Sequence, residues 1–206
     1  MKKILFIFII LGSINLNAQN DKKYLETLVE EFTQNLENRN IKNYFYTTRY
    51  CSGNIVMFKL DNGKRCMSKE TYYEVFIFWK EKEGVSMMKK IDNCGLYFSV
   101  PLPENDVVSF YLSNLEKLRS KVKNYKTAEK TIAPIQRTEI HNCYREFKFI
   151  YGNEKFEQLY NEFALINDSQ NANINFDYNN SLVVVSLDKI IDTIIEQTAK
   201  NLRRLP

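Results

Sequence analysis

One segment of the chain is apolar on both of the faces that a β-strand presents. The odd positions of residues 72–79 include Tyr73, Val75, Ile77 and Trp79, and the even ones include Tyr72, Phe76 and Phe78. Successive side chains of a strand point to opposite faces, so both faces of this segment would be apolar. Such a strand needs a covering layer on each side. We therefore expect residues 72–80 to form a central strand.

Turns that contain glycine separate this strand from other strand-like segments. We expect strands over 44–50, 55–60, 72–80, 85–91 and 96–100. The Asn62-Gly63 pair gives the strongest hairpin signal, because these residues suit a two-residue turn. Apolar and polar residues alternate over 85–91, which is typical of a half-exposed strand. Residues 44–100 are therefore predicted to form a meandering antiparallel sheet.

Three other segments repeat apolar residues every three or four positions, which is the spacing of one helix face. They cover residues 21–40, 104–124 and 188–202. Between the last two, Val183-Val184-Val185 has the composition of a short strand.

Residues 144–164 allow two interpretations. Phe147, Phe149 and Tyr151 alternate as in a strand, and Gly152-Asn153 suits a two-residue turn. Phe156, Leu159, Tyr160 and Phe163, however, have helical spacing. We favour a hairpin that ends before Phe163. The predicted fold class is α+β, a meandering antiparallel sheet packed by about three helices.

The first 18 residues have the three-part pattern of a secretory signal peptide. Two lysines precede an unbroken apolar run over residues 4–11, and a weaker polar stretch ends at Ala18. A membrane-spanning helix would need about 20 consecutive apolar residues, whereas this run is broken at Gly12. We expect cleavage after Ala18, no membrane anchor thereafter, and a single globular domain over 19–206 that is secreted or periplasmic.

The composition fits such a domain. Hydrophobic residues make up 44% of the chain, which is enough for a core and unlike a disordered segment. The formal net charge of +4 includes the two lysines of the leader, so the rest is close to neutral. We therefore expect no nucleic-acid partner, and a protein or an envelope polymer instead.

All four cysteines follow the leader, and an exported chain meets conditions that oxidise thiols. No two of them have the CxxC spacing of redox or zinc sites. In the predicted meander, Cys51 lies at one end of the sheet and Cys66 and Cys94 lie at the other, roughly 20 Å away. Bridged cysteines need Cα atoms within about 7 Å. We therefore expect two disulfides, Cys66–Cys94 and Cys51–Cys143, with Cys94–Cys143 as the main competing pair.

His141 is the only histidine, which excludes a metal site built from several histidines. On a strand it would share a face with Cys143, so a Cys–His nucleophile pair is geometrically conceivable. A bridged sulfur cannot attack a substrate, however, and we favour a structural role for both residues. No residue is assigned as catalytic, cofactor-binding or metal-ligating.

Other groups with chemical potential have simpler structural interpretations. Glu26 and Glu30, and Asp188, Asp192 and Glu196, recur at the spacing of a solvated helix face. The basic run over 117–130 is interpreted as another solvated face. The aromatic residues of 72–79 could stack on a sugar, but are more typical of a core. The sequence contains neither a calcium-binding loop nor a Gly-rich phosphate loop.

The function class follows by elimination. We expect an exported soluble protein that acts as a non-enzymatic binding or interaction module in the cell envelope or outside the cell. The alternatives are a secreted enzyme that uses His141 with Cys143, and an inhibitor or immunity-type partner of a secreted protein.

Overall fold

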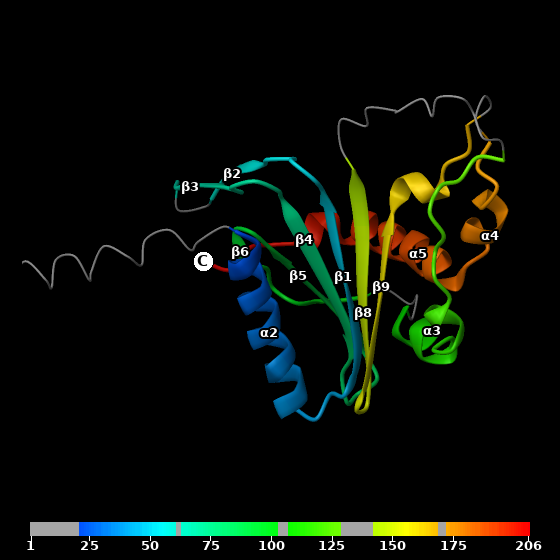
Figure 1. The fold of residues 1–206 in the computed structure, drawn as a ribbon. Helices are drawn as coiled ribbons and strands as arrows, with labels where there is room; N and C mark the ends of the chain where they lie inside the picture. Colours follow the sequence, from blue (N-terminus) through cyan, green and yellow to red (C-terminus); the bar gives the residue numbers. More distant parts are fainter. Residues whose placement is uncertain (1–20, 61–62, 103–106, 129–141, 169–171) are drawn as a thin grey trace, which may run out of the picture.

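The computed structural model describes residues 21–60, 63–102, 107–128, 142–168 and 172–206. These residues form an α+β fold in which an antiparallel sheet has helices on both faces (Figure 1), so the predicted fold class is confirmed. None of the helices in these ranges has both the length and the apolar character that crossing a membrane requires. The leader lies outside the described residues, and its cleavage stays a prediction.

The main sheet has seven strands, in the order β6-β5-β4-β1-β8-β9, with β7 also paired to β5. Their bounds are β1 (Asn43–Cys51), β4 (Tyr73–Lys80), β5 (Ser86–Asp92), β6 (Gly95–Leu96), β7 (Val100–Pro101), β8 (Cys143–Tyr151) and β9 (Glu154–Asn161). All of the pairings are antiparallel. A separate two-stranded sheet consists of β2 (Met57–Lys59) and β3 (Arg65–Met67).

The neighbours of β1 differ from those that the predicted meander would give it. β1 pairs with β4 on one side and with β8 on the other, and the segment 55–60 is not its neighbour. β2 and β3 do form the predicted hairpin, although residues 61–62 of its turn lie outside the described residues. β4 and β8 are long and apolar, so they bury far more surface against β1 than a three-residue strand could.

The central position of β4 is confirmed. Phe76 and Phe78 belong to one hydrophobic core, and Val75, Ile77 and Trp79 belong to a second core on the other face of the sheet. All five side chains are at most 2% exposed. The sheet therefore separates two cores, each of which needs its own covering layer.

The helices supply these layers. They are α2 (Lys22–Asn38), α3 (Val107–Ser113), α4 (Phe176–Asn180) and α5 (Val183–Thr198), with short 3-10 turns η1 (Lys117–Arg119), η2 (Glu162–Leu165) and η3 (Ala199–Asn201). α2 confirms the first predicted helix, and Asp21 caps it by accepting a hydrogen bond of 2.8 Å from the Tyr24 amide. In Figure 1, α2 lies on one face of the sheet, and α3 and α5 lie on the other.

The predicted helix over 104–124 is wrong beyond Ser113. Within its described part, α3 ends at that residue, only the short turn η1 follows, and residues 121–126 have no regular secondary structure. The side chain of Asn179 accepts a hydrogen bond of 2.9 Å from the Lys123 amide and donates one of 2.7 Å to the Lys123 carbonyl. An asparagine that satisfies both backbone groups removes the advantage of continuing the helix.

The predicted strand Val183–Val185 is also wrong, because these residues form the first turn of α5. Val184 and Val185 are buried, together with Leu187 and Ile191 of the following turns. Burial at helical spacing outweighs the modest preference of valine for strands.

Two further expectations have opposite outcomes. The predicted hairpin over residues 144–164 is confirmed, because β8 and β9 pair around Gly152 and end before Phe163.

The predicted half-exposed character of residues 85–91 is wrong, because Ser86 and Lys89 are buried. Lys89 is accommodated because its ammonium group donates a hydrogen bond of 2.6 Å to the Tyr97 carbonyl.

The disulfides are those predicted, Cys51–Cys143 and Cys66–Cys94. The predicted separation of Cys51 from Cys94 by the length of the sheet is nevertheless wrong. β1 ends at Cys51 beside the start of β4, and β5 ends there too, so Cys51 and Cys94 lie at the same end of the main sheet. Cys51 finds Cys143 because the two residues are directly opposite each other in the β1–β8 ladder.

We predict that the two disulfides stabilise the fold unequally. Cys51–Cys143 joins residues 92 positions apart, and Cys66–Cys94 joins residues 28 apart. The larger loop loses more entropy in the unfolded chain, by about 1 kcal/mol. In urea unfolding, Cys51→Ala/Cys143→Ala should therefore lower the free energy of unfolding by about 1 kcal/mol more than Cys66→Ala/Cys94→Ala. The reverse order would contradict the loop argument.

Candidate binding groove

α2 covers only part of its face of the sheet. Its buried residues Leu25, Val29 and Leu36 pack in the core that contains Val75 and Ile77, and most of its contacts with the sheet are with β4, β5 and β6. Over β8 and β9, the described part of the chain places no helix on this face (Figure 1). The polar side of α2 therefore faces an uncovered half of the sheet.

A groove runs between α2 and this uncovered half. It consists of two adjoining hollows of about 580 and 300 Å³, which share Glu30, Thr33, Tyr46 and Lys148 in their walls. The helix contributes one wall, and β1, β8 and β9 contribute the floor and the other wall. We call this feature the α2 groove.

Three tyrosines from three strands lie in a row on the same face of the sheet. Tyr50 of β1 is directly opposite Tyr73 of β4 and Tyr144 of β8, and its ring centroid lies 4.8 and 5.2 Å from theirs. All three side chains are partly exposed. The Lys22 ammonium group lies 5.7 Å from the centre of the Tyr73 ring. We call this row the tyrosine ladder, and it continues the α2 groove toward the Cys51–Cys143 end of the sheet.

The local sequence explains why the ladder forms. Tyr50 precedes Cys51 and Tyr144 follows Cys143, so the disulfide between directly opposed cysteines keeps the two tyrosines in register. Neighbouring aromatic rings across strands then stabilise each other. The ladder was not predicted from the sequence, although a tyrosine stands beside each cysteine of the expected pair, at Tyr50 and Tyr144.

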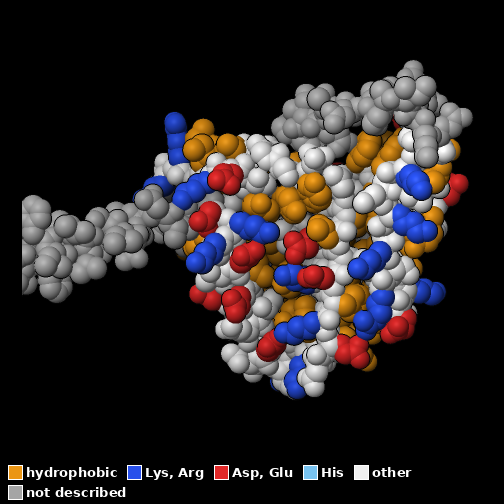
Figure 2. Space-filling model, in the orientation of Figure 1, with side chains coloured by type: hydrophobic (Ala, Val, Ile, Leu, Met, Phe, Trp, Pro, Cys, Tyr) orange, Lys and Arg blue, Asp and Glu red, His pale blue; other side chains and the backbone are white. Residues whose placement is uncertain are grey.

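The groove is acidic although the chain is not. Its described lining contains five carboxylates, those of Glu26, Glu30, Glu37, Glu146 and Glu157, and three lysines, Lys22, Lys148 and Lys155. Each lysine has a carboxylate within 3.6 to 3.8 Å. Figure 2 shows acidic and basic side chains gathered among hydrophobic ones on this face. The lining has a net charge of −2, whereas the whole chain has +4.

Two groups on the floor of the groove keep their ordinary protonation state. Burial raises the pKa of Tyr46, so its hydroxyl stays neutral. Burial would lower the pKa of Lys148, but Tyr46, Glu146 and Glu157 together raise it, so its ammonium stays charged. These two groups therefore offer hydrogen bonds and charge pairing, and neither is poised to exchange a proton at neutral pH.

Only one member of the candidate Cys–His pair, Cys143, lies in the described part of the chain. His141 lies outside the described residues. The sulfur of Cys143 is bonded to that of Cys51, and no cysteine of the chain has a free thiol. A bridged sulfur is not a nucleophile, so the enzyme hypothesis retains no thiol to act on. Among the residues that the structure describes, no group of His, Cys, Asp or Glu could hold a metal ion.

The remaining candidates are solvated or buried, with one correction. Glu26 and Glu30 are exposed, as are Lys117, Lys121 and Lys126 of the basic run, whereas Phe76, Phe78 and Trp79 lie in the cores. Among the aromatic residues of 72–79, only Tyr73 takes part in the tyrosine ladder. Asp188, predicted on a solvated face, is instead buried, with 7% exposure.

Asp188 is buried because it lies on the side of α5 that packs against two arginines of the sheet. Its carboxylate accepts a hydrogen bond of 2.6 Å from Arg49 and one of 2.7 Å from the Tyr160 hydroxyl. Arg145 lies 3.3 Å from the same carboxylate and also pairs with Glu162. Sequence periodicity could not reveal this cluster, because the arginines belong to β1 and β8 and face α5 only after folding. The cluster holds α5 on the sheet.

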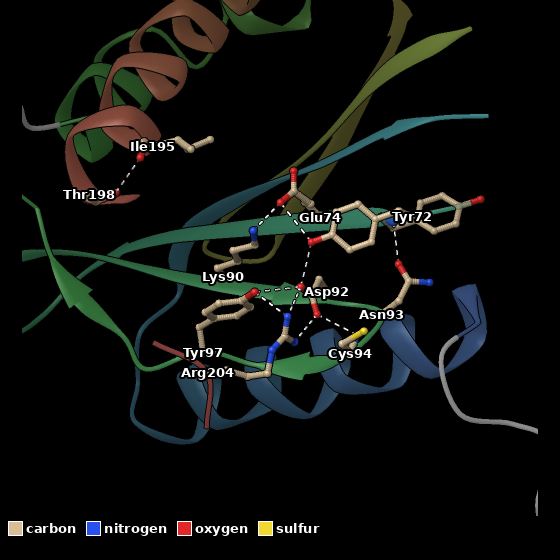
Figure 3. A network of polar contacts seen from close by, with 11 residues as sticks. Tyr72, Glu74, Lys90, Asp92, Asn93, Cys94, Tyr97, Ile195, Thr198 and Arg204 are labelled. Atoms are coloured by element: carbon tan, nitrogen blue, oxygen red, sulfur yellow. Dashed lines mark hydrogen bonds and ion pairs between the residues drawn. The ribbon is translucent and has the colours of Figure 1, made fainter. Parts of the chain in front are cut away.

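A second buried carboxylate, Asp92 at the end of β5, holds the C-terminal segment (Figure 3). It is fully buried and accepts two hydrogen bonds from Arg204, at 2.5 and 2.7 Å. The hydroxyls of Tyr72 and Tyr97 donate to it at 2.9 and 3.1 Å. The backbone beside Arg204 pairs with Leu96–Phe98. This network fixes the chain end against β6, and all of its members have partners, so we assign it a structural role.

The chain was compared with known proteins in three ways. No protein-family model, no curated protein and no solved structure matches it.

We predict that Asp188 and Asp192 contribute very differently to stability. Both contact Arg49, but the Asp192 side chain is 49% exposed and that of Asp188 is 11% exposed. Removing Asp188 leaves Arg49 and Arg145 with only their outer carboxylate partners, which costs up to about 3 to 5 kcal/mol, whereas the exposed Asp192 contributes up to about 1 kcal/mol. Chemical unfolding of Asp188→Ala and Asp192→Ala should show this difference, and equal losses would contradict the burial argument.

We also predict a loss of stability at alkaline pH. Burial, and then the charge of Asp92 or Asp188, raises the pKa of Tyr72, Tyr97 and Tyr160 above its usual value. Above about pH 10 the unfolded chain releases protons that the folded chain retains, so stability falls by about 1.4 kcal/mol per pH unit for each tyrosine. Below that pH this contribution is fully present.

Urea unfolding between pH 8 and 11 checks this expectation, with tyrosine absorbance as the readout of ionisation. Tyr160→Phe is the matched control, because it removes one titrating group and should make the pH dependence shallower by about 1.4 kcal/mol per unit. An unchanged slope would show that Tyr160 ionises in the folded protein.

Proposed function

We propose that this protein is an exported, non-enzymatic binding protein that holds an extended, positively charged segment of a partner protein in the α2 groove. The observation that carries the proposal is the position of the tyrosine ladder, partly exposed, at the end of a groove whose lining has a net charge of −2. Export is supported by the leader pattern and by two disulfides, which persist in oxidising compartments.

Tyrosine rings beside carboxylates suit lysine and arginine side chains. A cation over a tyrosine face is attracted by the ring, and Lys22 already lies in this way beside Tyr73. Glu146 lies two residues from Tyr144 on β8, on the same face of the sheet. A cation bound on the ladder would therefore have a carboxylate nearby. The same charges would repel anionic envelope polymers, and this favours a polypeptide partner.

The dimensions suit a short extended segment. Tyr50 at one end of the groove and Tyr44 at the other are six residues apart on β1, which corresponds to roughly 20 Å of strand. An extended peptide of about six residues has the same length. Its alternate side chains would face the floor, where the tyrosines and carboxylates lie.

A selection from a displayed library of random decapeptides tests the proposal. The oxidised chain of residues 19–206 is immobilised, and the selected peptides should be enriched in lysine and arginine. One selected peptide is then synthesised, and its affinity is measured by fluorescence anisotropy. Tyr144→Ala and Glu146→Gln should each weaken binding about tenfold, because each removes a contact of about 1 to 2 kcal/mol to a cation.

Tyr178→Ala is the matched control, since Tyr178 is an exposed tyrosine on α4 that belongs neither to the tyrosine ladder nor to the lining of the groove. Its affinity should equal that of the unchanged chain. Selection of no basic peptide would overturn the proposal. Binding of neutral polysaccharides that depends on Tyr144, without peptide binding, would assign the groove to a sugar polymer instead.

A further inference from the structure

The β2–β3 hairpin carries three large apolar side chains on its outer face. Ile55, Met57 and Met67 are 53%, 58% and 53% exposed, and Met57 is directly opposite Met67. Such a group of exposed apolar residues on one small element is unusual in a soluble domain and marks an interaction surface.

The inner face of the same hairpin is firmly attached to the domain. Cys66 forms the disulfide with Cys94, and the Phe58 ring packs on Tyr72 with its centroid 5.3 Å away. The guanidinium group of Arg204 lies 5.4 Å from the Phe58 ring, and Asp92 holds both Tyr72 and Arg204 (Figure 3). The described strands that carry the apolar outer face are therefore held against the domain by this packing.

Cations accompany the apolar side chains. Lys59 is directly opposite Arg65 in the β2–β3 ladder. This pair lies two residues from the Met57–Met67 pair on each strand, and so it is on the same exposed face. Over residues 55–70 the sequence has four basic and two acidic side chains. Figure 2 shows hydrophobic and Lys or Arg side chains together at the upper left, where Figure 1 places the hairpin.

A pocket of about 870 Å³ borders the hairpin on its inner side. Its described lining includes Lys59, Arg203 and Arg204 but no Asp or Glu side chain, together with apolar groups such as Phe58, Leu60 and Leu205. The pocket and the outer face share Lys59. Both features therefore combine apolar surface with positive charge at the same end of the molecule.

We propose that this end of the protein docks on an anionic lipid surface. Ile55, Met57 and Met67 would enter the boundary between headgroups and acyl chains, while Lys59 and Arg65 would contact anionic headgroups. The charge of the hairpin and its cationic neighbour Arg203 distinguish this surface from a site for a neutral membrane. The proposal is independent of the α2 groove, with which the hairpin shares no residue.

Co-sedimentation with vesicles tests the proposal. The oxidised chain of residues 19–206 is mixed with vesicles of equal parts phosphatidylglycerol and phosphatidylcholine, or of phosphatidylcholine alone, at 0.1 M salt. The partition coefficient should be at least tenfold higher with the anionic vesicles. The partition coefficient with anionic vesicles should fall at least tenfold in the double variants Lys59→Glu/Arg65→Glu and Met57→Ser/Met67→Ser. It should also fall at least tenfold for the unchanged chain when the salt is raised to 0.5 M.

Two matched variants carry the same kinds of substitution elsewhere. Leu159→Ser removes an exposed apolar residue from β9, and Lys189→Glu reverses an exposed charge on α5. Both should bind anionic vesicles like the unchanged chain, and fluorescence of the buried Trp79 verifies that every variant is folded.

Equal binding to the two kinds of vesicle, or equal loss in the hairpin and control variants, would overturn the proposal. Binding of soluble polyglutamate that depends on Lys59 and Arg65, without binding of vesicles, would also overturn it and would assign the hairpin to an acidic protein. If Tyr144→Ala loses peptide binding but keeps its vesicle binding, the lipid surface and the α2 groove are two independent binding sites.

Discussion

The whole architecture depends on β4, the strand that is apolar on both faces. Its alternating side chains are divided between two cores, so neither face can be left to water. α3 and α5 cover one face across most of the width of the sheet, and α2 covers the other mainly over β4, β5 and β6. Because the second layer is a single helix, β8 and β9 keep one face open. The α2 groove follows directly from this unequal coverage.

Two buried carboxylates complete the fold where apolar contact ends. Asp188 connects α5 to arginines of β1 and β8, and Asp92 connects the C-terminal segment to β5. Each accepts hydrogen bonds from several donors, which offsets the cost of removing a charge from water. Buried ionic groups of this kind tolerate few alternative arrangements. In this fold they connect α5 and the chain end to defined residues of the sheet.

The elements that could be predicted from the sequence are those whose signal is local. α2 shows a clear period of 3.6 and follows Asp21, β8 alternates with a period of 2 up to the turn at Gly152, and β4 is a continuous apolar run of strand length. Local signals were misleading at Val183–Val185 and beyond Ser113, where packing of α5 and the side chain of Asn179 decided the conformation. Contacts between distant segments outweigh propensity at such places.

The site could be predicted less well than the fold, because its residues come together only through strand pairing. Tyr50, Tyr73 and Tyr144 are far apart in sequence and become neighbours when β1 pairs with β4 and β8. The same pairing explains why the disulfides could be predicted correctly from an incorrect strand order. Opposite positions in a ladder bring Cys51 to Cys143 regardless of where the β2–β3 hairpin lies.

Each disulfide also positions one of the two proposed binding surfaces. Cys51–Cys143 keeps Tyr50 opposite Tyr144 in the tyrosine ladder, and Cys66–Cys94 attaches the hairpin whose outer face exposes Met57 and Met67. The groove is acidic and the hairpin is basic, so a cationic peptide and an anionic lipid surface would not compete for one site. Oxidation would then fix the geometry of both surfaces, because each depends on a cross-link that persists only outside a reducing compartment.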